Sequence, residues 1–131
     1  MYKIIIADDE HIIRTGLKEI LDWTELGFEI QEVFSDGEEI IEFLEYAVPD
    51  VILTDIKMVN ISGVEVAKYV SENKLPCKVV LLSGFQEFAL AVEAIKYNTE
   101  SYLLKPVNPD ELKNVFVSMR KKLDEEKVIR K

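Results

Sequence analysis

The chain has 131 residues, of which 48% are hydrophobic, and a formal net charge of −9 from 16 basic and 25 acidic residues. This length predicts one domain over residues 1–124, with a C-terminal tail or the start of a linker over 125–131, where the periodicity is lost. The acidic balance argues against binding of nucleic acid, and the lack of a membrane span or signal pattern predicts a cytoplasmic protein without membrane contact.

Short apolar runs alternate with segments that carry apolar residues at helical spacing. In chain order these predict a strand over 3–7, a helix over 11–23, a strand over 28–33, a helix over 37–47, a strand over 51–53, a helix over 63–72, a strand over 78–82, a helix over 86–97, a strand over 101–104 and a helix over 109–123. Strict alternation with short connections indicates a parallel sheet covered on both faces. We therefore expect the α/β class, as a flavodoxin-like doubly wound (βα)5 sheet of strand order 2-1-3-4-5.

Capping residues predict where several helices begin and end. Asp36 followed by Glu39 has the spacing of a capping box. Asn108 and Pro109 suit the N-cap and first position of the last helix, and Asn98 suits the left-handed residue that ends the preceding one. The apolar face expected for the helix over 86–97 consists of Phe88, Ala91, Val92 and Ile95.

Polar residues follow the predicted strands at their carboxyl ends. In the expected order, four strands bring to one edge Asp8, Asp9, Asp55, Ser83 and Lys105. Three carboxylates in one volume repel each other unless a cation lies among them, and oxygen ligands suit Mg²⁺. Each acid alone is as typical of a helix N-cap or a solvated loop as of a functional site, but three on adjacent strand ends favour a metal site.

These residues together predict a phosphoryl-transfer site with a carboxylate nucleophile. Asp9 and Asp55 can ligate Mg²⁺ directly, and Asp8 can reach it through a water. Ser83 offers a hydroxyl donor, and Lys105 offers a cation for a phosphoryl oxygen. Asp55 would attack phosphorus while the metal and Lys105 stabilise the transferring group, and an ionised carboxylate needs no protein base.

Five motifs in this order resemble the receiver domain of bacterial two-component response regulators, from about Tyr2 to Leu123. They are Ala7-Asp8-Asp9-Glu10, Thr54-Asp55-Ile56-Lys57-Met58, Gly63, Ser83-Gly84 and Tyr102-Leu103-Leu104-Lys105-Pro106. The resemblance implies a Mg²⁺-dependent switch that takes a phosphoryl group from a sensor histidine kinase onto Asp55. It implies no enzyme beyond limited autophosphotransfer and autodephosphorylation. It also implies a backbone carbonyl ligand from Lys57 and a cis peptide before Pro106.

The resemblance also implies a conformational switch through Ser83 and Tyr102. A phosphoryl group would draw the Ser83 hydroxyl towards it, and the space behind that hydroxyl would be open to Tyr102. The sequence departs from the usual family pattern at Val59, where proline is common, and at Asn98, where glycine is common. Neither change removes a reacting group.

Details elsewhere are most similar to the subgroup whose receiver is fused to an AraC-type helix-turn-helix domain. They are Gly16-Leu17-Lys18, Asp22-Trp23, Leu26-Gly27-Phe28 and Ala94-Ile95-Lys96. The resemblance then implies a transcriptional output domain that is absent from these residues. We expect the switch surface to contact protein, either a second copy or that output domain. The scattered cations predict no DNA binding by these residues.

Two other functions fit the same fold. A pseudo-receiver would act by unmodified protein contacts, but the complete set of acids, hydroxyl and lysine argues against it. A flavin protein would need a phosphate-binding loop after the first strand, and none is evident there. His11 is the only histidine; it would make the chain a phosphohistidine donor, although a helix-start residue without a reactive role is the simpler interpretation.

Overall fold

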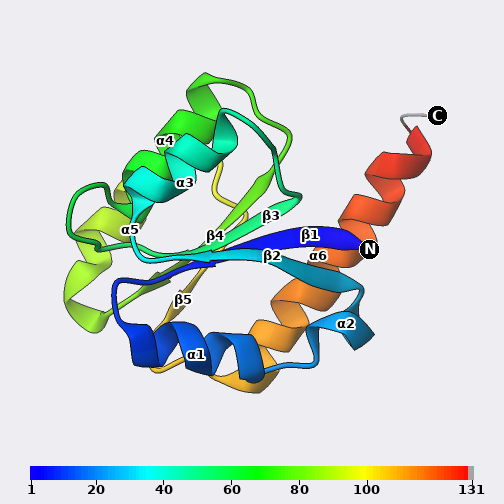
Figure 1. The fold of residues 1–131 in the computed structure, drawn as a ribbon, viewed down its shortest axis with the longest axis horizontal. Coiled ribbons are helices and arrows are strands. Elements are labelled where there is room, and N and C mark those ends of the chain that lie inside the picture. Colours follow the sequence, from blue (N-terminus) through cyan, green and yellow to red (C-terminus); the bar gives the residue numbers. More distant parts are fainter. Residues whose placement is uncertain (130–131) are drawn as a thin grey trace.

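The computed structural model describes residues 1–129, apart from the side chains of residues 85, 88 and 129. Its five strands form one parallel sheet in the order β2-β1-β3-β4-β5 (Figure 1), which confirms the predicted flavodoxin-like topology. The strands are β1 (Tyr2–Ala7), β2 (Phe28–Phe34), β3 (Val51–Asp55), β4 (Lys78–Ser83) and β5 (Ser101–Leu104). The helices are α1 (His11–Glu19), α2 (Trp23–Leu26), α3 (Gly37–Leu44), α4 (Gly63–Glu72), the 3₁₀ turn η1 (Phe85–Glu87), α5 (Phe88–Ile95) and α6 (Pro109–Ile129).

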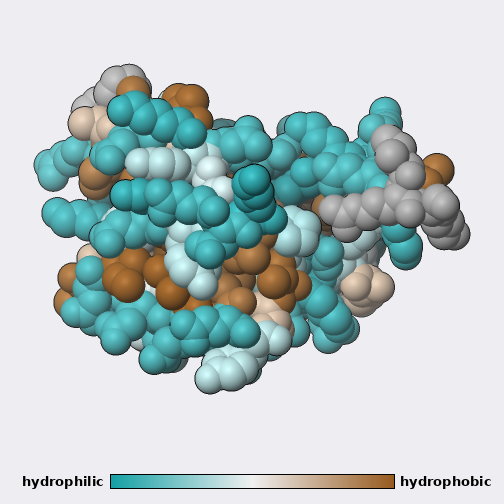
Figure 2. Space-filling model, turned by 90° about the horizontal axis from the view of Figure 1, so that it is seen from above, coloured by the Kyte–Doolittle hydropathy of each residue, from teal (hydrophilic) through white to brown (hydrophobic). Residues whose placement is uncertain are grey.

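Alternate strand residues point to opposite faces of the sheet and fill two separate cores. On one face, Ile5, Ile52 and Leu81 pack with α3, α4 and α5. On the other, Ile4 and Val80 pack with α1, α2 and α6, as the two layers in Figure 1 show. Figure 2 looks onto the first layer, whose outer surface is mostly hydrophilic with apolar side chains visible between the helices. Because β3 is buried throughout, its last residue is held firmly at the sheet edge.

The single helix predicted over 11–23 is wrong, because the chain forms α1 and α2 there instead. Asp22 interrupts the helix and caps α2 by accepting a backbone hydrogen bond from it. The break turns Trp23 inward, so that its indole donates to the Leu17 carbonyl at 3.0 Å. The same ring meets Phe116 of α6 edge-on, with ring centroids 4.9 Å apart.

Asp36 begins α3 as predicted, but its capping box with Glu39 does not form. The Asp36 carboxylate accepts hydrogen bonds from the amides of Asn60 (2.9 Å) and Ile61 (3.1 Å), in the loop before α4. Glu39 accepts hydrogen bonds from Ser35 instead. Hydrogen bonds from a distant loop have therefore replaced the hydrogen bond that the capping box would place between the Asp36 carboxylate and the Glu39 amide.

The apolar face predicted for α5 is partly wrong. Ala91 is buried, but Val92 and Ile95 are 47% and 61% exposed, and the buried partner of Ala91 is Ala94. The inner face of α5 thus carries the two alanines, with Leu90 packed beside them, while Val92 and Ile95 face outward. The side chain of Phe88, the fourth predicted member, lies outside the described residues.

The last helix is longer than the sequence predicts. Helix α6 spans 21 residues and ends at Ile129, so the helix continues through the segment in which periodicity is lost. Residues 130 and 131 lie outside the described residues, and the domain boundary at 124 stays a prediction. No helix within residues 1–129 is both long enough and apolar enough to cross a membrane.

Candidate functional site

The carboxyl ends of β1, β3, β4 and β5 meet at one edge of the sheet. Asp8 directly follows β1, Asp55 and Ser83 are the last residues of β3 and β4, and Lys105 directly follows β5. Asp9 lies exposed beside them, whereas Asp8, Asp55 and Ser83 are buried. The structure thus brings together the residues that the strand-end pattern predicts.

The three acids converge on one small volume around a lysine. Asp8, Asp9 and Asp55 each place a carboxylate oxygen within 4.8 Å of the others. Lys105 Nζ donates to Asp8 Oδ2 at 2.9 Å and lies 3.1 Å from Asp55 Oδ2. Lys105 therefore pairs with two of the three carboxylates. A surplus of negative charge on an all-oxygen donor set fits a hard divalent ion such as Mg²⁺.

The crowding changes the acidity of these groups. Burial raises the pKa of Asp55 to about 6, with a further rise from Asp8 that Lys105 opposes. Burial and the contact with Asp8 also raise the pKa of Asp9. Because its folded pKa is raised, Asp55 stabilises the fold only when protonated. That contribution is complete below the unfolded pKa of about 4 and is lost as the pH rises through about 6. At neutral pH the site favours an added cation.

Two buried polar atoms at this edge have no hydrogen-bond partner among the described residues. They are Asp55 Oδ1 and Ser83 Oγ. Buried polar groups are nearly always paired, so two such atoms on neighbouring strands need an explanation. A ligand that bonds to the carboxylate oxygen and accepts from the hydroxyl would satisfy both.

Gly63 allows the loop after β3 to close tightly. A Cβ atom at this position would lie 2.4 Å from the Asp55 carbonyl oxygen, so only glycine permits the approach. The Gly63 amide donates to the Ile56 carbonyl at 2.7 Å. Ser62 and Glu65 form a capping box that starts α4 at the same point. These contacts fix both ends of the loop that carries Lys57.

An open cleft of about 540 Å³ lies over the acidic cluster. It is lined by Asp9, Glu10, Asp55, Lys57, Met58, Val59, Gly84, Glu87 and Lys105. The peptide bond before Pro106 is cis, as the resemblance implies. The carbonyl role of Lys57 stays a prediction. His11 opens α1 and lies near Arg14, with 3.5 Å between ring and guanidinium nitrogens; it is not among the residues that line the cleft.

Glu87 lines the cleft, although the strand-end pattern in the sequence does not include it. Its carboxylate accepts a hydrogen bond from the Gly84 amide at 3.0 Å. A glutamate three residues after a small residue at a strand end has the spacing of half a capping box. That spacing was the available signal for the contact.

Apolar side chains are exposed on both α5 and β5. Strand β5 is an edge strand, and its Tyr102 and Leu104 are 39% and 51% exposed. With Val92 and Ile95 of α5, these residues form what we call the α5/β5 surface. Leu104 pairs in register with Ser83 of β4, which connects this surface to the site through neighbouring strands.

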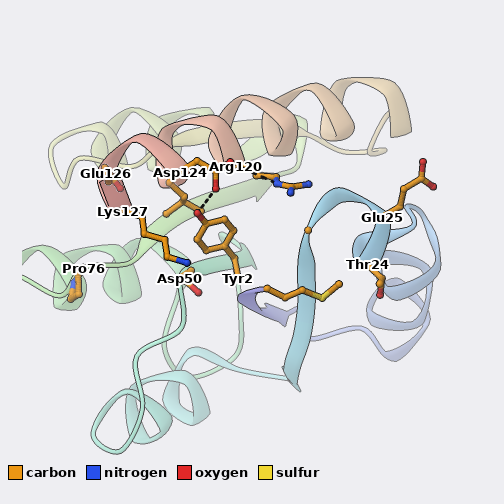
Figure 3. Close-up of a pocket in the computed structure, with 12 residues that line it drawn as sticks. Tyr2, Thr24, Glu25, Asp50, Pro76, Arg120, Asp124, Glu126 and Lys127 are labelled. Carbon is orange, nitrogen blue, oxygen red and sulfur yellow. Dashed lines mark hydrogen bonds and ion pairs between the residues drawn. The ribbon is translucent and has the colours of Figure 1, made fainter. Parts of the chain in front are cut away.

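A larger cavity, of about 600 Å³, lies at the opposite end of the strands, near the residues where they begin (Figure 3). The Tyr2 hydroxyl donates to Asp124 of α6, and Arg120 donates to the Leu26 carbonyl at 3.1 Å. The hydrogen bond to Asp124, and then burial, raise the pKa of Tyr2 to about 12. These groups bind each other, so we interpret this region as a clamp that holds α6 against β1.

Known proteins share this architecture. The family model for the response regulator receiver domain matches residues 4–117. The transcriptional regulatory protein YesN of Bacillus subtilis strain 168 is 40% identical over 112 residues, which are 86% of this chain and 30% of YesN. The REC domain of AraT, a response regulator from Geobacillus stearothermophilus, is 37% identical with a TM-score of 0.89, covering 96% of this chain and 98% of that one. The two-component transcriptional regulator AraC from Clostridium phytofermentans ISDg is 27% identical with a TM-score of 0.86, covering 97% and 98%. The chain spans less than half the length of the curated relatives that it matches.

Proposed function

The chain belongs to the response regulator receiver domain family, and from that premise we propose that it is the phosphorylation-dependent switch of a cytoplasmic two-component system. A sensor histidine kinase supplies the phosphoryl group, Asp55 accepts it, and the resulting change passes to an output domain. Transcriptional regulators among the relatives favour a DNA-binding output domain, of the AraC type in the subgroup that the sequence resembles.

One observation carries this proposal, namely the environment of the Asp55 carboxylate. Its Oδ2 lies 3.1 Å from Lys105 Nζ, whereas its Oδ1 is buried and has no partner within residues 1–129. An anionic oxygen held in place at a cleft, with its other oxygen already paired, is oriented for nucleophilic attack.

In the transfer, Asp55 Oδ1 attacks the phosphorus of the kinase phosphohistidine. The new bond joins this oxygen to phosphorus, and the P–N bond breaks with its electron pair remaining on the imidazole, which takes a proton from solvent. Asp9, Asp55 and the Lys57 carbonyl would hold a Mg²⁺ ion, with Asp8 reaching it through a water, and the ion would supply positive charge for the phosphoryl oxygens. Lys105 stabilises the same charge from the β5 side. Attack by water later releases phosphate and regenerates the carboxylate.

A small phosphodonor tests this function. We expect acetyl phosphate with Mg²⁺ to add one phosphoryl group, seen by intact mass and mapped to Asp55, and a chelator to prevent it. Because the nucleophile must be ionised and bound Mg²⁺ lowers the pKa of Asp55 from its metal-free value of about 6, the initial rate should rise with pH only below about 6 and be level above it. An unchanged mass under these conditions would instead favour a pseudo-receiver or another ligand.

The switch would act through Ser83 and the α5/β5 surface. The phosphoryl group brings about −1.5 to −2 charges and three acceptor oxygens, so the unpaired Ser83 hydroxyl would turn towards it. Tyr102, partly exposed on the next strand, would move into the space behind. This movement would change the α5/β5 surface that a partner contacts.

We expect the switched surface to bind protein and not DNA. Beryllofluoride, a phosphoryl mimic, should increase self-association in sedimentation velocity, and Ser83→Ala should remove that increase. Gel shifts should show no duplex binding in either state, because the net charge of −9 repels DNA. Salt-sensitive duplex binding at micromolar protein would contradict the prediction about DNA. Sedimentation that does not change when beryllofluoride is added would contradict the prediction about self-association.

A further inference from the structure

Glu87 places its carboxylate on the backbone amide that opens the turn after β4. The Gly84 amide donates to Glu87 Oε2 at 3.0 Å, and the Glu87 amide donates to the Gly84 carbonyl at 3.1 Å. Glu87 is the N-cap residue of α5, yet its side chain makes no capping bond to that helix. The carboxylate folds back over the residue next to Ser83. The transfer of the phosphoryl group described above does not use it.

The same carboxylate faces the acidic cleft. Gly84 and Glu87 line this cleft together with Asp55 and Lys105. Burial and Asp8 raise the pKa of Asp55, and the negative charge of Glu87 adds to the rise. Within residues 1–129, the group of acids close enough to share a metal ion does not include Glu87. Glu87 therefore has the position of a fixed anion near the nucleophile and outside the cluster of metal-binding acids.

A phosphoryl group in this cleft needs hydrogen-bond donors for three oxygens and about −1.5 to −2 charges. Exposed backbone N–H groups are common donors for such anions. The Gly84 amide is one that lines the cleft, and its hydrogen bond already goes to a carboxylate. Two anions cannot share one N–H without repulsion, so a phosphoryl oxygen and Glu87 would compete for it.

Building on the proposed function, we infer that Glu87 is a tethered anion that holds the Gly84 amide in the unphosphorylated domain and is displaced when Asp55 carries a phosphoryl group. Glu87 is thus a positioning residue that opposes the phosphorylated state. Its release frees η1 and the start of α5, the helix that presents Val92 and Ile95 on the α5/β5 surface.

Glu87→Gln tests this inference because it keeps the accepting oxygen and the size of the side chain but removes the charge. At saturating Mg²⁺, we expect this variant to bind beryllofluoride about 3- to 10-fold more tightly than wild type in ¹⁹F NMR titrations, since a charge-assisted hydrogen bond is about twice as strong as a neutral one. Its thermal midpoint and its affinity for Mg²⁺ alone should stay close to wild type.

Glu10→Gln is the matched control, because Glu10 also lines the cleft but does not bind the Gly84 amide. It should change beryllofluoride affinity by less than about twofold, as expected for a solvated charge. Equal affinity in Glu87→Gln and wild type would overturn the inference, and so would an equal gain in both variants. Wild-type protein that binds no beryllofluoride would refute the proposed function itself and this inference with it.

Discussion

Replacing Asp55 with asparagine is expected to lower the rate of phosphoryl incorporation by about a thousandfold or more, as removal of a nucleophile does elsewhere. The amide oxygen has the same position as the carboxylate oxygen but not its charge, so it is a poor nucleophile. The fold should persist, because the substitution removes a buried charge beside Asp8, while Lys105 still pairs with Asp8 at 2.9 Å. Intact mass after incubation with acetyl phosphate and Mg²⁺ measures the effect.

Glu42→Gln is a suitable control for this experiment. Glu42 is an exposed acid on α3 and lines none of the described cavities, so its replacement should leave incorporation unchanged. Incorporation into Asp55→Asn at the wild-type rate would mean that another residue accepts the phosphoryl group.

Replacing Lys105 with methionine is expected to destabilise the domain by about 3 kcal/mol at neutral pH, since a buried ion pair that loses one partner leaves an uncompensated charge. Here two carboxylates, Asp8 and Asp55, lose the same partner. Loss of Lys105 also removes the group that lowers the pKa of Asp55. The free energy of unfolding of the variant should therefore differ least from that of wild type below pH 6, where Asp55 is protonated, and most above pH 6. Urea unfolding followed by circular dichroism at pH 5 and pH 7.5 measures the loss of stability and its dependence on pH.

Lys78→Met is the matched control for this prediction. Lys78 is also mostly buried, with 17% of its side chain exposed against 23% for Lys105, and it also faces two acids, Glu100 and Glu126. These acids are partly exposed, so its loss should cost about 1 kcal/mol or less. Equal losses of stability in the two variants would contradict the prediction. So would a loss of stability in Lys105→Met that does not depend on pH.

The topology and the acidic cluster follow from local sequence because both depend on where strands end. A strand buried on both faces, such as β3, fixes the position of the acid that follows it, and parallel neighbours bring the other acids to the same edge. The outward rotation of α5 was not predictable in the same way. Its apolar residues occur on all sides of the helix, so their spacing does not select one inner face. Whether Ala91 and Ala94 face inward depends on how α5 packs against the sheet.

The capping of α3 also depends on a tertiary contact. The Asp36 carboxylate accepts hydrogen bonds from amides 24 and 25 residues away, and no local spacing in the sequence predicts such partners. Glu87 lies outside the strand-end pattern for a different reason: the motifs of the site are strand ends, whereas Glu87 belongs to the turn that follows one. Its hydrogen bond to Gly84 is local, and the spacing that predicts it is present in the sequence.

The aromatic contact between Trp23 and Phe116 gives the domain a built-in optical probe. Trp23 is the only tryptophan, it is buried, and it lies in the core that α6 covers, on the opposite side of the sheet from α5. Its fluorescence should therefore report the packing of α6 and not respond directly to ions in the acidic cleft. An emission change on phosphorylation would then show that the signal crosses the sheet, and constant emission would confine it to the α5 side.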